Sequence, residues 1–201
     1  CPCDGMEVYI AAQNGHEAMV RALIEAGADV NKAMNDAVTP LIIAAQNGHE
    51  AVVRALIEAG ADVNKVWGNG VTPLLVAAHQ HNEAVVRTLI EAGADVNQAR
   101  DDGVTPLCIA AQDGHEAVVR ALIEAGAEID KARDDSVTPL YIAAENGHET
   151  IVRALIEAGA DVNKATNNGW TPLAIATQEG HTAVVQILRD AVLVQMQHLY
   201  L

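Results

Sequence analysis

Histidine is the residue type in this sequence that could most readily do chemistry, because the imidazole ring can bind a metal or transfer a proton near neutral pH. Five of the eight histidines follow a glycine and recur at a step of 33 residues or twice that: His16, His49, His115, His148 and His181. Helix packing would keep such rings roughly 10 Å apart, whereas zinc needs its ligands about 2 Å from one centre. We therefore predict that these histidines begin helices and hydrogen-bond locally, without a metal.

His79 and His81 are the other candidates for a metal site, because they lie only two residues apart. In a helix, side chains share a face at spacings of three or four residues, and zinc-binding helices use a spacing of four. We therefore predict no metal there. His81 also stands where other repeats of the sequence carry a helix-ending glycine, and Asn82 stands where they carry histidine. This turn is expected either to be strained or to shift the end of its helix.

The three cysteines, Cys1, Cys3 and Cys108, have the pattern of neither a disulfide framework nor a catalytic thiol. An odd count without regular spacing favours a reducing compartment, and we expect a cytoplasmic protein. No basic cluster beside Cys108 in the sequence would lower the pKa of its thiol, and residues 68–73 lack the Gly-Lys of a phosphate-binding loop. We interpret the Cys-Pro-Cys start as an arbitrary end rather than as a metal or redox site. The sequence thus predicts neither an enzyme nor a cofactor.

All these residues occupy fixed places in a sequence that repeats every 33 residues. Thr-Pro recurs at Thr39, Thr72, Thr105, Thr138 and Thr171, and Gly-Ala recurs at the same step. Thr is a favoured N-cap, and Pro is tolerated in the first turn because its missing N–H would be unpaired there. The stretch TPLxIAA therefore predicts a short helix that ends near glycine, and HEAVVRALIEA predicts a second helix with one apolar stripe. The outer face of the second helix carries Glu and Arg at a spacing of four, which predicts a ladder of charge pairs.

The unit GVTPLxIAAQxGHEAVVRALIEAGADVNKA resembles the ankyrin repeat, and the resemblance covers almost the whole chain. It implies an all-α solenoid of about six stacked helix–turn–helix units, with a β-turn finger at each junction. We predict one ankyrin-repeat domain over residues 1–201, in which residues 1–33 are an N-terminal capping repeat. The full repeats are expected at 34–66, 67–99, 100–132 and 133–165, and a C-terminal capping repeat at 166–201.

The last unit departs from the pattern, because Val192-Leu193 replaces its Gly-Ala stop and an apolar stretch runs on to Leu201. Capping repeats usually carry a polar outer face. Two interpretations remain open: a lengthened helix that folds onto the array, or an interface that lacks its partner.

Positions that change from unit to unit are free to serve a partner, whereas constant positions serve the unit itself. The varying positions form three sets. One set lies at the fingertips, the second lies two residues after Thr-Pro, and the third lies four residues later, at the end of the first helix. The middle set replaces the histidine typical of ankyrin repeats, and two interpretations remain open for it: contact with a partner or packing in the core. Aromatic and arginine side chains dominate binding hot spots. The candidate partner-binding residues are Met34, Ile42, Trp67, Leu75, His79, Arg100, Asp101, Cys108, Gln112, Arg133, Asp134, Tyr141, Glu145 and Trp170.

The formal net charge of −15 argues against nucleic acid and against anionic membrane surfaces as partners. No run of about 18 apolar residues predicts a membrane span, and no signal peptide is recognisable. We predict a non-enzymatic module that binds another protein through its fingertips and concave face. The alternative is a structural array that forms a homo-oligomer through the apolar concave row or the C-terminal tail. The near-identity of residues 13–32 and 46–65 fits consensus design or a recent tandem duplication.

Overall fold

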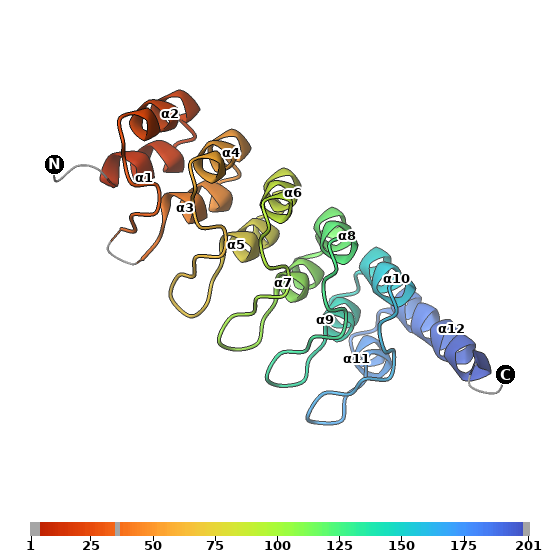
Figure 1. Cartoon of the computed structure of the whole chain (residues 1–201). Helices are drawn as coiled ribbons and strands as arrows, with labels where there is room; N and C mark the ends of the chain where they lie inside the picture. The colour runs from red at the N-terminus through yellow and green to blue at the C-terminus, as the bar shows by residue number, and fades with distance from the viewer. Residues whose placement is uncertain (1–4, 35–36, 199–201) are drawn as a thin grey trace. The chain divides into compact units, whose positions relative to one another are not determined.

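The computed structural model of the chain describes residues 5–34 and 37–198, without the side chains of residues 196–198. It divides into two compact units, residues 1–101 and 102–201. The described residues form twelve helices and no strand beyond one isolated β-bridge, which confirms the all-α prediction (Figure 1). The helices of the first unit are α1 (Met6–Gln13), α2 (Glu17–Glu25), α3 (Pro40–Gln46), α4 (Glu50–Glu58), α5 (Pro73–His79) and α6 (Glu83–Glu91). Those of the second unit are α7 (Pro106–Asp113), α8 (Glu116–Glu124), α9 (Pro139–Glu145), α10 (Glu149–Glu157), α11 (Pro172–Gln178) and α12 (Thr182–His198).

Within each unit the helices stack in two layers, one made of first helices and one of second helices. In the first unit α1, α3 and α5 pack in succession, and so do α2, α4 and α6. In the second unit α7, α9 and α11 form one layer, and α8, α10 and α12 form the other. Paired alanines such as Ala44 and Ala45 are fully buried, and their small side chains allow the close approach of neighbouring helices. Each layer therefore buries apolar surface that no single helix pair could bury alone.

Each first helix after α1 begins at the Thr-Pro pair that the sequence predicts as its start. The side-chain oxygen of Thr39 accepts a hydrogen bond from the Ile42 N–H at 3.3 Å, and Pro40 occupies the first turn. Such an N-cap satisfies one of the four unpaired N–H groups at a helix start. The same bond forms at Thr72, Thr105, Thr138 and Thr171. The predicted N-caps are therefore confirmed.

The second helices bury the apolar stripe and expose the charged ladder. In α4, Val52 and Leu56 are buried, and Arg54 lies 2.8 Å from Glu50 across one turn. Equivalent pairs form between Glu17 and Arg21, Glu83 and Arg87, and Glu116 and Arg120. The third residue of the ladder behaves differently, because Glu58 pairs with Arg21 of the preceding repeat at 3.0 Å. The ladder therefore joins neighbouring repeats as well as successive turns of one helix.

The turn at His81 keeps the position of the helix end and adopts a strained backbone. Helix α5 ends at His79, in the same place where α3 ends at Gln46. His81 has φ 58°, in the left-handed region where the equivalent Gly48 has φ 73°. A residue with a Cβ atom is disfavoured in that region. Of the two expected outcomes, strain is therefore observed and a shifted helix end is not.

The C-terminal helix is longer than the other second helices, since α12 has 17 residues where α10 has nine. It packs against both α10 and α11, and Gln195 donates a hydrogen bond from Nε2 to the Ala160 carbonyl at 3.5 Å. The first interpretation of this segment, a lengthened helix folded onto the array, therefore agrees with the structure. Leu199, Tyr200 and Leu201 lie outside the described residues, as do Cys1 and Cys3.

Candidate protein-binding surface

The repeat junctions are called fingers here, and in four of them backbone hydrogen bonds join the first and fifth residues into a hairpin. Trp67 and Val71 donate their N–H groups to each other's carbonyl at 2.8 and 2.9 Å. Neighbouring fingers are also joined, because Asp101 donates its N–H to the Asn69 carbonyl at 3.0 Å in the first unit. In the second unit the Asn167 N–H donates to the Asp135 carbonyl at 3.2 Å. The other fingers close from Met34 to Val38, from Arg133 to Val137 and from Thr166 to Trp170.

The two tryptophans lie on fingers, at opposite ends of the hairpin. Trp67 is the first residue of its finger and is partly buried, whereas Trp170 is the fifth residue of its finger and is 40% exposed. The backbone under both side chains is fixed by the hydrogen bonds that close the hairpin. An exposed indole on a fixed backbone offers a large contact area at a low entropic cost. The hydrogen bonds agree with the prediction that Trp67 lies on a finger. Trp170 was predicted on the concave row of the first helices, but it is the fifth residue of a finger.

The charged candidates also lie on fingers. Asp101 and Asp134 are exposed, and Arg100 and Arg133 are partly buried. Arg133 donates from Nη2 to the Asp135 carboxylate at 3.1 Å. Exposed pairs of this kind contribute little to stability. The exposed carboxylates of Asp101 and Asp134 can therefore meet complementary charges on a partner.

The residues two places after Thr-Pro belong to the core. Ile42, Leu75, Cys108 and Tyr141 are each at most 8% exposed. The question left open by the sequence is thus decided in favour of core packing, since a buried side chain offers a partner no surface in the free chain. Burial raises the pKa of the Cys108 thiol, and the Cys108 Sγ lies 3.8 Å from the Lys131 carbonyl oxygen. A reactive cysteine needs the opposite shift in pKa.

The residues four places later, in the last turn of each first helix, point to solvent. Gln46 and His79 are exposed in the first unit, and Gln112 and Glu145 are exposed in the second. This position is glutamine in four repeats, His79 in the third and Glu145 in the fifth, and two alanines precede it in all repeats but the last. They form the part of the predicted helix face that a partner can reach.

The histidines that follow glycine hold this row in place, by a bond that the sequence did not predict. His148 Nε2 lies 3.0 Å from the Gln112 carbonyl, and His181 Nε2 lies 2.9 Å from the Glu145 carbonyl. His49 makes the equivalent contact with the Gln13 carbonyl. For these three histidines the predicted local hydrogen bond is therefore wrong, because each ring bonds the preceding repeat, 36 residues away. The bond fixes the backbone of a row residue and leaves its side chain exposed.

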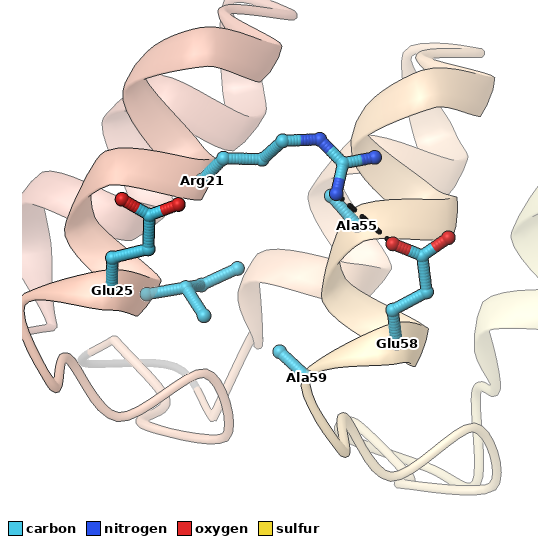
Figure 2. Close-up of a pocket in the computed structure, with 6 residues that line it drawn as sticks. Arg21, Glu25, Ala55, Glu58 and Ala59 are labelled. Carbon is cyan, nitrogen blue, oxygen red and sulfur yellow. Dashed lines mark hydrogen bonds and ion pairs between the residues drawn. The ribbon is translucent and has the colours of Figure 1, made fainter.

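A small groove lies elsewhere in the first unit, between α2 and α4 (Figure 2). Its volume is about 180 Å³, and it is lined by Arg21, Ile24, Glu25, Ala55, Glu58 and Ala59. Sites for small molecules usually enclose about 300–1,000 Å³ and converge on a few polar groups. The groove is therefore a seam between repeats rather than a substrate pocket.

Sequence reasoning did not select Met6, Ile10 and Met19, which are large, apolar and exposed in the first repeat. The signal for Met6 and Glu7 was present, because this pair replaces Thr-Pro. Ile10 and Met19 are apolar like their buried counterparts in later repeats, so their residue types did not indicate that they would be exposed.

The described residues contain neither a cluster of metal ligands nor a helix that could span a membrane. Within residues 5–34 and 37–198, no three His, Cys, Asp or Glu side chains lie where they could hold a metal ion together. No helix in the same part of the chain has both the length and the apolar character to cross a membrane.

The repeat geometry agrees with a match to a known family. The family model described as ankyrin repeats, three copies, matches residues 7–66, 63–133 and 130–196. The chain belongs to the ankyrin repeat family. No curated protein matches it. Ankyrin repeats are generally modules of protein–protein interaction, so the fingers and the row of this ankyrin repeat protein are the surfaces to consider for a partner.

Proposed function

We propose that this ankyrin repeat protein is a non-enzymatic module that binds another protein through its fingers and through the exposed row of its first helices. The observation that carries the proposal is the exposure of side chains that vary between repeats on a framework that does not vary. Gln46 and His79 differ in type, and so do Gln112 and Glu145, while the alanines before them are buried in every case. The six predicted repeats, from 1–33 to 166–201, provide this framework.

Rigidity supports the proposal. A partner that binds Trp170 or Trp67 meets a finger already closed by backbone hydrogen bonds, so little conformational entropy is lost on binding. The acidic chain, with a net charge of −15, favours a partner with a basic surface. Of the candidates selected from the sequence, the accessible ones are Met34, Trp67, His79, Arg100, Asp101, Gln112, Arg133, Asp134, Glu145 and Trp170.

The test is an affinity measurement with alanine variants of the two tryptophans. A partner captured with the native chain is purified, and its dissociation constant is measured for Trp67→Ala, Trp170→Ala and the double variant. Each single change is expected to weaken binding by about tenfold or more, because aromatic anchors carry more than about 1 kcal/mol of binding free energy. Tyr141→Ala is unsuitable here, since this side chain is buried and its loss would disturb folding.

Arg153→Ala is the matched control, because Arg153 is exposed on the second helix α10, away from the fingers. Circular dichroism checks that every variant keeps its helical content. If both tryptophan variants bind as tightly as the native chain, the finger assignment fails.

Self-association through the C-terminal helix is the second candidate function. It is favoured by Leu193 and Val194, which are 59% and 54% exposed on α12. Light scattering at several concentrations distinguishes the two functions. A chain that stays monomeric both with and without residues 192–201 argues against self-association.

A further inference from the structure

The first repeat exposes apolar side chains on the side of α1 and α2 that faces away from α3 and α4, called the upstream face here. Met19 is 54% exposed and Ile10 is 47% exposed. Their equivalents in the second repeat are Val52, at 1%, and Ile43, at 8%. Since α3 packs on α1 and α4 packs on α2, the first repeat buries these equivalents. The upstream face is therefore the kind of surface on which this chain stacks a neighbouring repeat.

The upstream face also carries small residues at the positions where α4 carries the alanines that line the groove beside α2. Ile24 of α2 lines the groove together with Ala55 and Ala59 of α4. Ala22 and Ala26 hold the equivalent positions in the first repeat, and both are exposed. An isoleucine placed like Ile24 would fill that space.

Polar residues that join repeats are present on the upstream face too. In the second repeat, His49 Nε2 and Asn47 Nδ2 contact the Gln13 carbonyl at 3.0 and 2.9 Å. Glu58 accepts a hydrogen bond from Arg21 at 3.0 Å (Figure 2). The first repeat carries the same three residue types at the equivalent positions: His16, Asn14 and Glu25.

The last repeat differs from the internal repeats at two of its exposed positions. Its exposed Thr177 stands where Ala144 is fully buried one repeat earlier, and its exposed Arg189 stands where α10 carries Ile156. Arg189 holds the position of Ile24, the residue that lines the groove of the first unit. Ile24 lines that groove opposite Ala55 and Ala59, and an arginine in its place would lose this apolar contact or bury part of its charge. A second copy stacked end to end is therefore a poor occupant for the upstream face.

We propose that the upstream face binds a further ankyrin repeat, stacked in the register that α1–α2 and α3–α4 use. The occupant presents isoleucine at the position of Ile24 and arginine at the position of Arg21. The arginine would pair with Glu25, and the ring of His16 would reach a carbonyl at the end of the occupant's first helix. Residues 1–33 then serve as an internal repeat, in place of the capping role that the sequence predicts.

The test supplies such a repeat, by fusing a copy of residues 34–66 directly before Cys1 of the full chain. Peroxide oxidation of Met19 is followed by mass spectrometry, because oxidation of methionine depends on the exposure of its sulfur. Oxidation is expected to slow by about tenfold in the fusion. The thermal midpoint is expected to rise by about 5 °C or more, since stacked repeats stabilise one another.

The matched control is the same fusion with Ile57→Arg in the added copy, which reproduces the residue found at Arg189. This control is expected to leave Met19 as reactive as in the unfused chain. Equal reactivity of Met19 in the fusion and the unfused chain would overturn the proposal, and so would equal protection by the control copy. It would also be overturned if light scattering showed a dimer of the unfused chain that Met19→Glu dissociates, because a second copy would then occupy the face.

Discussion

Single positions in this protein are best understood by comparing them with the same position in other repeats. Because the repeats share one backbone structure, a difference between equivalent positions can be attributed to the side chain. At the position two residues after Thr-Pro, Ile42, Cys108 and Tyr141 differ greatly in size, yet all are buried. At the turn between the two helices, His81 replaces glycine and takes its left-handed backbone. Variation between repeats therefore does not by itself mark the surface, because it also occurs in the buried core and in a fixed turn.

His81→Gly is predicted to increase the free energy of unfolding by about 0.5–1 kcal/mol. The left-handed conformation costs a residue with a side chain about 1–2 kcal/mol, and the greater freedom of glycine in the unfolded chain offsets part of that gain. Urea denaturation measures the change. The reverse substitution, Gly147→Ala, is the control: Gly147 has φ 73°, and an added Cβ would lie 2.6 Å from the His181 ring, so stability should fall. A loss of stability in His81→Gly would mean that contacts of the His81 side chain outweigh the strain.

At the scale of helices, the contact between successive repeats depends on side chains that reach backward along the chain. Three of the histidines after glycine lie beside a carbonyl of the preceding first helix: His49, His148 and His181. Asn82, the exception, donates from Nδ2 to the Ala45 carbonyl at 3.3 Å. The shorter asparagine thus keeps a hydrogen bond to the preceding repeat, and the stack tolerates the substitution.

His148→Ala is predicted to lower the free energy of unfolding by about 1 kcal/mol, because it removes a hydrogen bond between repeats. His148→Asn should recover part of that loss, as Asn82 does in its own repeat. Thermal denaturation followed by circular dichroism measures both. The interpretation fails if the asparagine variant is no more stable than the alanine variant.

At the scale of the whole molecule, each of the two units buries apolar side chains between its two helix layers and keeps its charges outside. The consequence is a core with few titratable groups, in which the Cys108 thiol is the buried nucleophile among the described residues. Burial raises the pKa of Cys108 above its ordinary value of 9.0. The folded state therefore holds the thiol proton more tightly than the unfolded state. This contribution to stability is complete below pH 9 and is lost as the pH rises above it.

Cys108→Ala is predicted to flatten the decline of stability with alkaline pH. In the native chain the unfolded thiol ionises first, so each pH unit above about 9 removes up to about 1.4 kcal/mol until the folded thiol also ionises. Urea denaturation at about pH 8, 9 and 10 measures how steeply the free energy of unfolding falls with pH. Cys1 and Cys3 remain in both proteins, so their ionisation is common to the comparison. Equal slopes in the two proteins would show that the buried thiol does not contribute.

The amino-acid sequence by itself determined the repeat and its local structure. The 33-residue step, the Thr-Pro helix starts and the apolar stripe of each second helix depend on residues close in the chain, and these predictions are confirmed. Local capping and periodicity need no knowledge of neighbours. The sequence likewise placed Trp67 on a finger, because the place of a residue within the repeat is fixed by its distance from Thr-Pro.

Only the tertiary structure decided which way the variable residues point and what the histidines bond. Tyr141 and Glu145 share one helix face, yet Tyr141 is buried and Glu145 is exposed, because the neighbouring repeats cover the start of the helix and leave its last turn open. Ile10 and Ile43 are the same residue in the same place of their repeats, and only Ile43 has a repeat stacked over it. Burial is a property of the stack, and a sequence read one repeat at a time does not contain it.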